Sequence, residues 1–325
     1  MSGTFVPDFF YLKFLPIRFK VLKWNKKLRE GIFVLSPENT VIAFIGTGVM
    51  GKSMAGHLLE AGFPLIVYNR TKEKAEELLK KGAQWADSPK EAAKKANVIF
   101  TIVGYPYDVE EVYLGEDGLV SNAKENSYII DMTTSTPSLA KRIYEEALKR
   151  GIHAIDAPVS GGDIGAREAR LAIMAGGDKE SFDEVRPLLE KLGTNIIYQG
   201  PAGSGQHTKM CNQIAIASNM IGVSEALVYA KKAGLDPENV LKSISTGAAG
   251  SFSLSNLAPR MLKGDFEPGF YIKHFIKDMK IALDEAEKME VDFPGLSLAK
   301  SMYDQLAKSG ESESGTQALY KYWKE

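Results

Sequence analysis

Between Val41 and Gly200, short apolar runs alternate with longer segments of helical character. The runs are rich in β-branched residues, and most are bounded by polar or glycine-containing stretches. In chain order they read VIAFI, LIVY, VIFTIV, YIID, HAID, LAIMA and NIIY. This alternation predicts βαβ units and a mainly parallel sheet that is buried on both faces.

Three helix starts are marked by a capping residue followed by proline. A capping side chain accepts a hydrogen bond from the first turn, and proline at the first helical position loses no needed hydrogen bond. The three pairs are Ser88-Pro89, Thr136-Pro137 and Asp236-Pro237.

The strand pattern stops after Gly200, where GPAGSG predicts a loop or hinge. A long apolar segment follows and predicts a helix over roughly 204–232, with Lys231 and Lys232 at its negative end and Gly234 just beyond. Further helices are expected at roughly 237–246, 252–263, 272–290, 295–309 and 315–324. The sequence therefore predicts an α/β Rossmann-type N-terminal domain over 37–201, followed by an all-α C-terminal domain over 202–325 that opens with a long interdomain helix.

The first 36 residues depart from this pattern. They are basic and aromatic, as in FFYLKFLPIRFKVLKWNKKLR, with no clean helical period. They lack the small-residue cleavage site of a secretory signal and are poor in serine for a transit peptide. Arg29-Glu30-Gly31 can be encoded by a purine-rich ribosome-binding sequence, and Leu35 by the alternative start codon TTG. We therefore expect residues 1–36 to be an extension outside the fold.

Composition narrows the class of protein. Of the 325 residues, 44% are hydrophobic and 25% are charged, and the formal net charge is −1. These values are typical of a globular protein and give no charge footprint for nucleic acid or a membrane surface. The single cysteine, Cys211, excludes an intrachain disulfide and fits a reducing compartment, so we expect a cytoplasmic protein.

The four histidines and the long apolar run carry no further signal of a metal or a membrane. The histidines are scattered, and no Cys/His spacing indicates a metal site. The run after residue 214 is interrupted by four polar residues, so we do not expect it to span a membrane. These residues are Ser218, Asn219, Ser224 and Glu225.

A glycine-rich turn lies directly after the first predicted strand. Gly46, Gly48 and Gly51 form G-x-G-x-x-G at the opening of a helix. The first glycine permits the tight turn, the second lets a pyrophosphate approach the backbone, and the third lets helix and strand pack closely. Because the strand–turn–helix context is the required one, we expect dinucleotide binding here, with Thr47, Val49 and Met50 also in contact.

The residues after the second strand bear on the choice of dinucleotide. NAD-binding enzymes place an acidic residue here for the ribose hydroxyls, whereas this chain has Asn69-Arg70-Thr71. A neutral side chain does not repel a 2′-phosphate, the guanidinium can pair with it, and the hydroxyl can donate to it. NADP(H) is therefore predicted over NAD(H), unless Arg70 is simply a solvated loop arginine.

Four signatures occur in the order found in one enzyme family. They are FIGTGVMG at Phe44–Gly51, DAPVSGG at Asp156–Gly162, GQHTKMCN at Gly205–Asn212 and KDM at Lys277–Met279. With these signatures the chain resembles the β-hydroxyacid dehydrogenase family over Val41–Glu325. The resemblance implies a Rossmann-type domain, an all-α domain, and an active site in the cleft between them. It also implies a homodimer or homotetramer, formed through the helical domain.

The resemblance assigns Lys209 to catalysis. As an ammonium it would donate a proton to the developing alkoxide of a small carboxylate substrate, and as an amine it would accept that proton in the reverse direction. Partial burial lowers a lysine pKa toward neutrality, which suits this exchange. Asn212 and Gln213 share a helix face with Lys209, so they are candidates to orient the lysine or the substrate oxygen. The alternative is that Lys209 has no catalytic role, and that its aliphatic chain packs against the protein while its ammonium stays in water.

The resemblance also assigns residues around the lysine. Ser160, Gly161 and Gly162 would bind the substrate carboxylate through backbone N–H groups and the serine hydroxyl. Lys277 would lie near both nicotinamide and substrate. Positions expected at the cofactor are Val103, Gly104 and Thr134. One departure is Ala169-Arg170-Leu171, where many family members have Gly-Thr-Leu.

Two other classes of protein remain open. One is a non-catalytic NADP-binding or assembly protein on the same scaffold, since fold does not fix function. The other is a related enzyme with a different substrate, such as an imine reductase, which usually lacks the lysine, or 6-phosphogluconate dehydrogenase, which normally has a longer C-terminal region.

Overall fold

The computed structural model describes residues 35–323, which belong to one compact unit. The expected extension lies outside the described residues apart from Leu35 and Ser36. Leu35 is 7% exposed and packs in the core of the sheet domain, so the fold begins slightly before the expected boundary.

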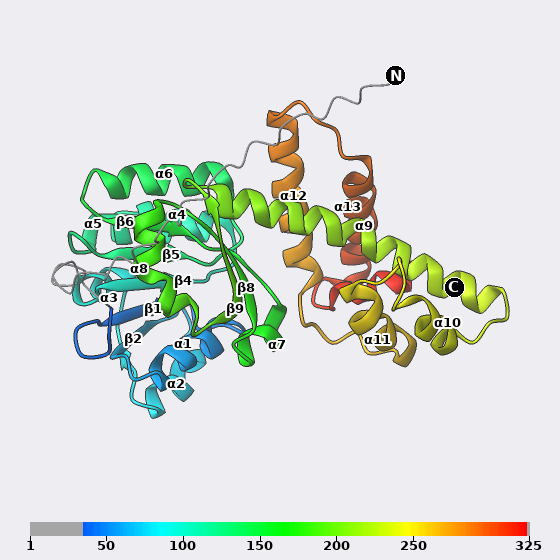
Figure 1. Cartoon of the computed structure of the whole chain (residues 1–325), viewed down its shortest axis with the longest axis horizontal. Helices are drawn as coiled ribbons and strands as arrows, with labels where there is room; N and C mark the ends of the chain where they lie inside the picture. The colour runs from blue at the N-terminus through cyan, green and yellow to red at the C-terminus, as the bar shows by residue number, and fades with distance from the viewer. Residues whose placement is uncertain (1–34, 324–325) are drawn as a thin grey trace, which may run out of the picture. The chain divides into compact units, whose positions relative to one another are not determined.

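A parallel-rich sheet forms the first half of the molecule (Figure 1). In the described residues its strand order is β3-β2-β1-β4-β5-β6-β8-β7, with β9 paired to β8. The pairs from β3 to β6 are parallel, as predicted. The strands are β1 (Ile42–Ile45), β2 (Leu65–Tyr68), β3 (Gln84–Trp85), β4 (Val98–Thr101), β5 (Tyr128–Asp131), β6 (His153–Asp156), β7 (Val159–Ser160), β8 (Leu171–Gly176) and β9 (Gly193–Gly200).

The sheet departs from the prediction in two ways. The two-residue strands β3 and β7 give no hydrophobic run long enough to be recognised from sequence. In addition, β8 runs antiparallel to both β6 and β7, because the short connection before it does not supply the long crossover that a parallel pair needs.

Helices cover both faces of the sheet. Side chains of α1, α2 and α8 pack with one face, and side chains of α3 to α6 pack with the other. In the first of these cores the rings of Phe44 and Phe100 stack with centroids 5.9 Å apart. The helices of this half are α1 (Gly51–Glu60), α2 (Glu76–Lys80), α3 (Pro89–Lys95), α4 (Pro106–Leu114), α5 (Leu119–Asn122), α6 (Pro137–Leu148), α7 (Gly162–Arg167) and α8 (Lys179–Leu189). A short 3₁₀ segment, η2 (Lys72–Ala75), precedes α2.

The three predicted caps are confirmed. Ser88 Oγ accepts from the Glu91 N–H at 3.1 Å, and Thr136 Oγ1 accepts from the Leu139 N–H at 3.2 Å. The carboxylate of Asp236 accepts from the Glu238 N–H at 3.0 Å. Each cap satisfies an N–H group that has no partner inside its own helix.

The long helix α9 (Ser204–Lys232) matches its predicted bounds and leads from the sheet into the helical half (Figure 1). Helices α12 and α13 pack against it around a third hydrophobic core. At the centre of that core, the rings of Phe275 and Tyr303 meet edge to face at 5.1 Å. The other helical elements are α10 (Pro237–Ile244), η3 (Ser253–Leu257), α11 (Ala258–Lys263), α12 (Ile272–Lys288), α13 (Pro294–Leu306), η4 (Ala307–Glu311) and η5 (Thr316–Trp323).

Candidate active site

The glycine-rich turn after β1 has the geometry that dinucleotide binding requires. Gly46 has φ +97°, and a Cβ there would lie 2.1 Å from the Ile102 carbonyl oxygen. A Cβ on Gly51 would lie 1.9 Å from the Gly46 carbonyl oxygen, so α1 packs closely on the turn. A Cβ on Gly48 would meet nothing within 4 Å. The first and third glycines are thus needed for packing, while the second leaves open space where a pyrophosphate can approach.

Thr47 and Asn69 connect this turn to the end of β2. The Thr47 N–H donates to Asn69 Oδ1 at 3.0 Å, and Asn69 Nδ2 donates to the Thr71 carbonyl oxygen at 2.8 Å. The hydroxyl of Thr47 is buried and has no hydrogen-bond partner within residues 35–323. A buried hydroxyl without a partner is costly, so this one fits a site that a polar ligand completes. Val49, at the tip of the turn, is 59% exposed.

Arg70 points into solvent and forms an ion pair that the sequence did not suggest. Its Nη1 lies 3.0 Å from Oδ1 of Asp108, and its side chain is 76% exposed. The other carboxylate oxygen of Asp108 accepts from the Tyr105 N–H at 3.0 Å. The Asp108 side chain, by contrast, is only 9% exposed, so Arg70 reaches a buried carboxylate from solvent and its guanidinium stays accessible to another anion.

The loops after β4 and β5 meet each other and the helical domain. The Val103 N–H donates to Thr133 Oγ1 at 3.0 Å, while Gly104 lies close to the Asp108 carboxylate. The carbonyl oxygen of Thr134 accepts a hydrogen bond from Lys277 Nζ at 2.7 Å. These loops follow the carboxyl ends of their strands, where ligands bind in such sheets.

The Ser160-Gly161-Gly162 segment turns sharply between β7 and α7. Gly161 and Gly162 have φ +132° and +63°, values that side chains with a Cβ rarely adopt. A Cβ on Gly162 would lie 3.3 Å from the carbonyl oxygen of Gly269 in the helical domain. The segment therefore lies where the two domains meet.

Lys209 is a buried cation in the second turn of α9. It is 6% exposed, and its ammonium takes part in no hydrogen bond or ion pair within the described part of the chain. Burial lowers the pKa of Lys209 to about 8, with a further lowering by the charge of Lys277 and an opposing contribution from Asp278. A lysine with this pKa can gain and lose a proton near neutral pH.

Asn212 and Gln213 do not contact Lys209 through hydrogen bonds. Asn212 Nδ2 donates to Gln213 Oε1 at 2.7 Å, and Gln213 Nε2 donates to Asp278 Oδ2 at 2.5 Å. Asp278 is 1% exposed, and its Oδ1 lies 3.1 Å from Lys277 Nζ. The amides therefore hold the carboxylate of Asp278, which lies beside Lys277 and whose charge acts on Lys209. Contact of Asn212 with the substrate stays a prediction.

Two buried residues that the sequence analysis did not assign to the site hold the start of α9. The Asp156 carboxylate accepts from the Gly203 N–H at 2.7 Å and from the Gln206 N–H at 2.9 Å. The side chain of Gln206 is fully buried and bonds to the loop after β5. The available signal was a neutral amide three residues before Lys209, on the same helix face.

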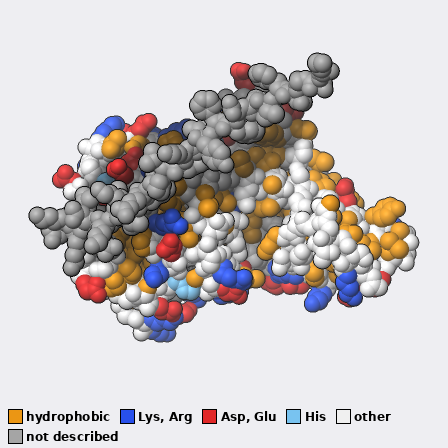
Figure 2. All heavy atoms as spheres, viewed as in Figure 1, with side chains coloured by type: hydrophobic (Ala, Val, Ile, Leu, Met, Phe, Trp, Pro, Cys, Tyr) orange, Lys and Arg blue, Asp and Glu red, His pale blue; other side chains and the backbone are white. Residues whose placement is uncertain are grey.

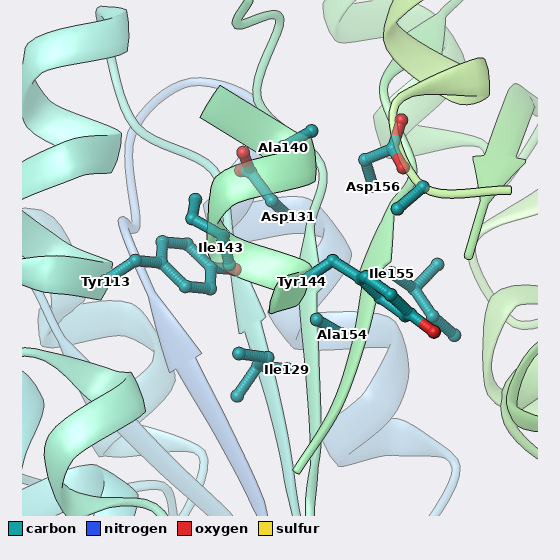
Figure 3. Close-up of a pocket in the computed structure, with 10 residues that line it drawn as sticks. Tyr113, Ile129, Asp131, Ala140, Ile143, Tyr144, Ala154, Ile155 and Asp156 are labelled. Carbon is teal, nitrogen blue, oxygen red and sulfur yellow. The ribbon is translucent and has the colours of Figure 1, made fainter. Parts of the chain in front are cut away.

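A small cavity separates Asp156 from a second buried carboxylate, Asp131 (Figure 3). Asp131 Oδ1 accepts from Thr101 Oγ1 and from the Thr133 N–H, each at 3.0 Å. Burial is the main cause that raises the pKa of each carboxyl to about 6. Through their hydrogen bonds, Asp131 holds the loop after β5 and Asp156 holds the start of α9.

Comparison with known proteins agrees with a dinucleotide-binding sheet domain followed by a helical domain. A family model described as the NAD binding domain of 6-phosphogluconate dehydrogenase matches residues 41–200. A second, described as NAD-binding of NADP-dependent 3-hydroxyisobutyrate dehydrogenase, matches residues 203–323. The 2-hydroxy-3-oxopropionate reductase of Escherichia coli is 39% identical over 278 residues, which is 86% of this chain and 95% of that protein. The chain belongs to the β-hydroxyacid dehydrogenase family.

Other relatives support the same assignment. An uncharacterized oxidoreductase of Bacillus subtilis is 67% identical over 282 residues, 87% of this chain and 98% of that protein. The structure of Mycobacterium tuberculosis 3-hydroxyisobutyrate dehydrogenase with L-serine matches with a TM-score of 0.81 and 29% identity, covering 88% of this chain and 99% of that one. As a family member, this β-hydroxyacid dehydrogenase is an NAD(P)-binding oxidoreductase that acts on CH–OH groups.

Within residues 35–323, no helix combines the length and apolar character needed to cross a membrane. Side chains of both charge signs are interspersed on the face that Figure 2 shows.

Proposed function

We propose that this β-hydroxyacid dehydrogenase transfers hydride reversibly between NADP(H) and a small β-hydroxy acid or semialdehyde acid, with Lys209 as the general acid and base. The observation that carries the proposal is the burial of Lys209 at 6% exposure, with a pKa lowered to about 8. A proton-transfer group works best when its pKa lies near the working pH.

The bound nicotinamide supplies the hydride in reduction and accepts it in oxidation. The ammonium of Lys209 then donates a proton to the oxygen of the substrate carbonyl as that carbon is reduced. In oxidation the neutral amine takes the hydroxyl proton. Because the ammonium makes no hydrogen bond with the described residues, its donors are available to a substrate oxygen.

Binding of the substrate carboxylate is proposed at Ser160-Gly161-Gly162. The two glycines turn the backbone sharply enough to present N–H groups to an anion, and the Ser160 hydroxyl adds a donor. In the related Mycobacterium tuberculosis enzyme the ligand is L-serine, which carries a carboxylate and a β-hydroxyl group. This chemistry is the class that we propose for the present substrate.

The preference for NADP(H) is proposed on the residues after β2. Asn69 brings no negative charge, and the exposed guanidinium of Arg70 can pair with the double charge of a phosphate. The helical half also matches a family model described as NADP-dependent.

A substrate panel tests the proposal. Reduction of tartronate semialdehyde, succinic semialdehyde and glyoxylate by the purified enzyme is assayed with NADPH and with NADH. Oxidation of 3-hydroxyisobutyrate is assayed with NADP⁺ and with NAD⁺. We expect turnover of at least one of these acids with kcat/KM higher for the NADP form. Turnover of none of them would contradict the substrate class, and a higher kcat/KM with NADH would contradict the cofactor preference.

A further inference from the structure

The side chain of Gln206 joins α9 to the loop between β5 and α6. Its Oε1 accepts from the Ser135 N–H at 2.9 Å, and its Nε2 donates to the Thr133 carbonyl oxygen at 2.7 Å. The oxygen and the nitrogen of the amide are thus both hydrogen-bonded to backbone groups of the same loop. Gln206 is fully buried, so both bonds are shielded from water and neither can be replaced by solvent.

This loop is the one that the helical domain also holds. Between Thr133 and Ser135, the carbonyl oxygen of Thr134 accepts from Lys277 on α12 at 2.7 Å. Thr133 in addition accepts, through its hydroxyl, the Val103 N–H of the neighbouring loop. Gln206 therefore binds the loop at the residues on either side of the one that Lys277 binds.

Gln206 is itself held rigidly. Its N–H donates to the Asp156 carboxylate at 2.9 Å, and the start of α9 approaches the sheet very closely. A Cβ on Gly205 would lie 2.3 Å from the Met174 carbonyl oxygen. Because Lys209 follows Gln206 by three residues on the same helix face, the position of the loop relative to Lys209 is fixed by this amide.

We propose that Gln206 is a positioning residue that clamps the loop Thr133–Ser135 onto the helix of Lys209, and so sets the distance between hydride donor and proton donor. The inference rests on the proposed function, in which the loop contacts the cofactor and Lys209 delivers the proton. A misplacement of about 1 Å can cost about 100-fold in rate even when every reacting group is present.

The first test replaces the amide by a thioether of similar length. Gln206→Met is compared with wild type for kcat, for NADPH affinity by fluorescence titration, and for the isotope effect with cofactor deuterated at the transferred hydrogen. We expect kcat to fall by about 10- to 100-fold, the isotope effect to rise as hydride transfer becomes limiting, and NADPH affinity to change by less than about threefold. Wild-type values of kcat and of the isotope effect would overturn the proposal.

A control variant separates positioning from loss of stability. Asn97 accepts the Val41 N–H at 2.9 Å at the amino ends of β1 and β4, whereas the site lies at the carboxyl ends of the strands. Asn97→Leu removes this side-chain bond to the backbone and should lower the melting temperature without changing the isotope effect. If Gln206→Met behaves in the same way as this control, Gln206 has a structural role only and the proposal is wrong.

A conservative variant provides rescue. The carboxylate of Gln206→Glu cannot donate to the Thr133 carbonyl oxygen, but the protonated carboxyl can. Asp156 and Asp131 nearby favour the protonated form, and Lys209 and Lys277 oppose it. We expect activity relative to wild type to rise as pH falls for Gln206→Glu and to stay flat for Gln206→Met. A flat ratio for both variants would count against the clamp.

The same assays include Lys209→Ala. An active Lys209→Ala enzyme would show that the proposed proton donor is wrong, whatever Gln206 does. An inactive Lys209→Ala enzyme together with a Gln206→Met enzyme of wild-type kinetics would leave the proposed function standing and remove only the positioning role.

Discussion

Lys277 on α12 donates a hydrogen bond to the carbonyl oxygen of Thr134, 2.7 Å away on the loop after β5. This bond joins the helical domain to the cofactor side of the Rossmann domain. The same ammonium lies 3.1 Å from the buried carboxylate of Asp278. Lys277 thus has two partners, Thr134 and Asp278, whereas Lys209 has no hydrogen-bond or ion-pair partner within residues 35–323. This difference supports the proposal that Lys209 exchanges the proton.

Asp278 is expected to tune the proton donor. Its negative charge raises the pKa of Lys209 and so opposes the lowering by burial. In reduction the ammonium form is needed, so the rate falls as pH rises through this pKa. Asp278→Asn should therefore move the basic limb of the kcat/KM profile for reduction to lower pH, measured between pH 6 and 10.

A matched control for this variant lies on the same helix. Glu285 is 8% exposed and pairs with Lys288 at 2.7 Å. Glu285→Gln should leave the basic limb where it is in wild type. A basic limb that does not move in Asp278→Asn, or that moves equally in both variants, would show that Asp278 does not act on Lys209 in particular.

Arg70 and Asp108 give a prediction about the cofactor. Arg70→Ala removes the cation proposed for the 2′-phosphate and should lower kcat/KM for NADPH by about 10-fold while changing that for NADH little. Asp108→Asn removes the competing anion and should raise kcat/KM for NADPH. Arg142→Ala removes an exposed arginine that pairs with Glu110 and serves as the control. Equal losses with NADPH and NADH in Arg70→Ala would contradict the assignment.

Asp131 gives a prediction about stability and pH. Burial raises its pKa to about 6 from 3.8, so the folded protein binds this proton more readily than the unfolded chain. The stabilisation is full below about pH 4 and is lost as pH rises toward 6. Asp131→Asn keeps an oxygen for both hydrogen bonds but cannot ionise. Its melting temperature relative to wild type should rise between pH 4 and pH 7.

The control for the stability measurement is an exposed carboxylate. Asp117 pairs with Lys90 at 2.7 Å, and its side chain is 65% exposed. Asp117→Asn should leave the pH dependence of the melting temperature close to that of wild type. If Asp131→Asn shows no change relative to wild type over the same range, the buried carboxyl does not titrate as described.

The sequence predicted the elements well because their signals are local. Buried strands such as Ile42–Ile45 are continuous apolar runs, and the caps at Ser88, Thr136 and Asp236 act within one helical turn. The bounds of α9 agree with the predicted range of roughly 204–232, since its glycine-rich start and lysine-rich end are both visible in the sequence.

The sequence did not predict contacts between distant segments. Arg70 meets Asp108 across 38 residues, and Gln206 meets Ser135 across 71. Such pairs depend on how the loops at the carboxyl ends of the strands come together. The pattern of hydrophobic and polar residues along the chain carries no information about that arrangement. The sequence also did not predict that Asn212 donates to Gln213 and that Gln213 donates to Asp278. The catalytic and binding roles of these residues stay predictions.

The most direct test of the central claim is the single-turnover rate of reduction by Lys209→Ala with saturating NADPH. Without a general acid, the rate should fall by about 100- to 10,000-fold and lose the fall near pH 8, while NADPH affinity stays close to that of wild type. Lys280→Ala, at an exposed lysine of α12 that pairs with Asp284, should react as wild type does. A Lys209→Ala rate within about threefold of wild type, with the same pH profile, would contradict the account.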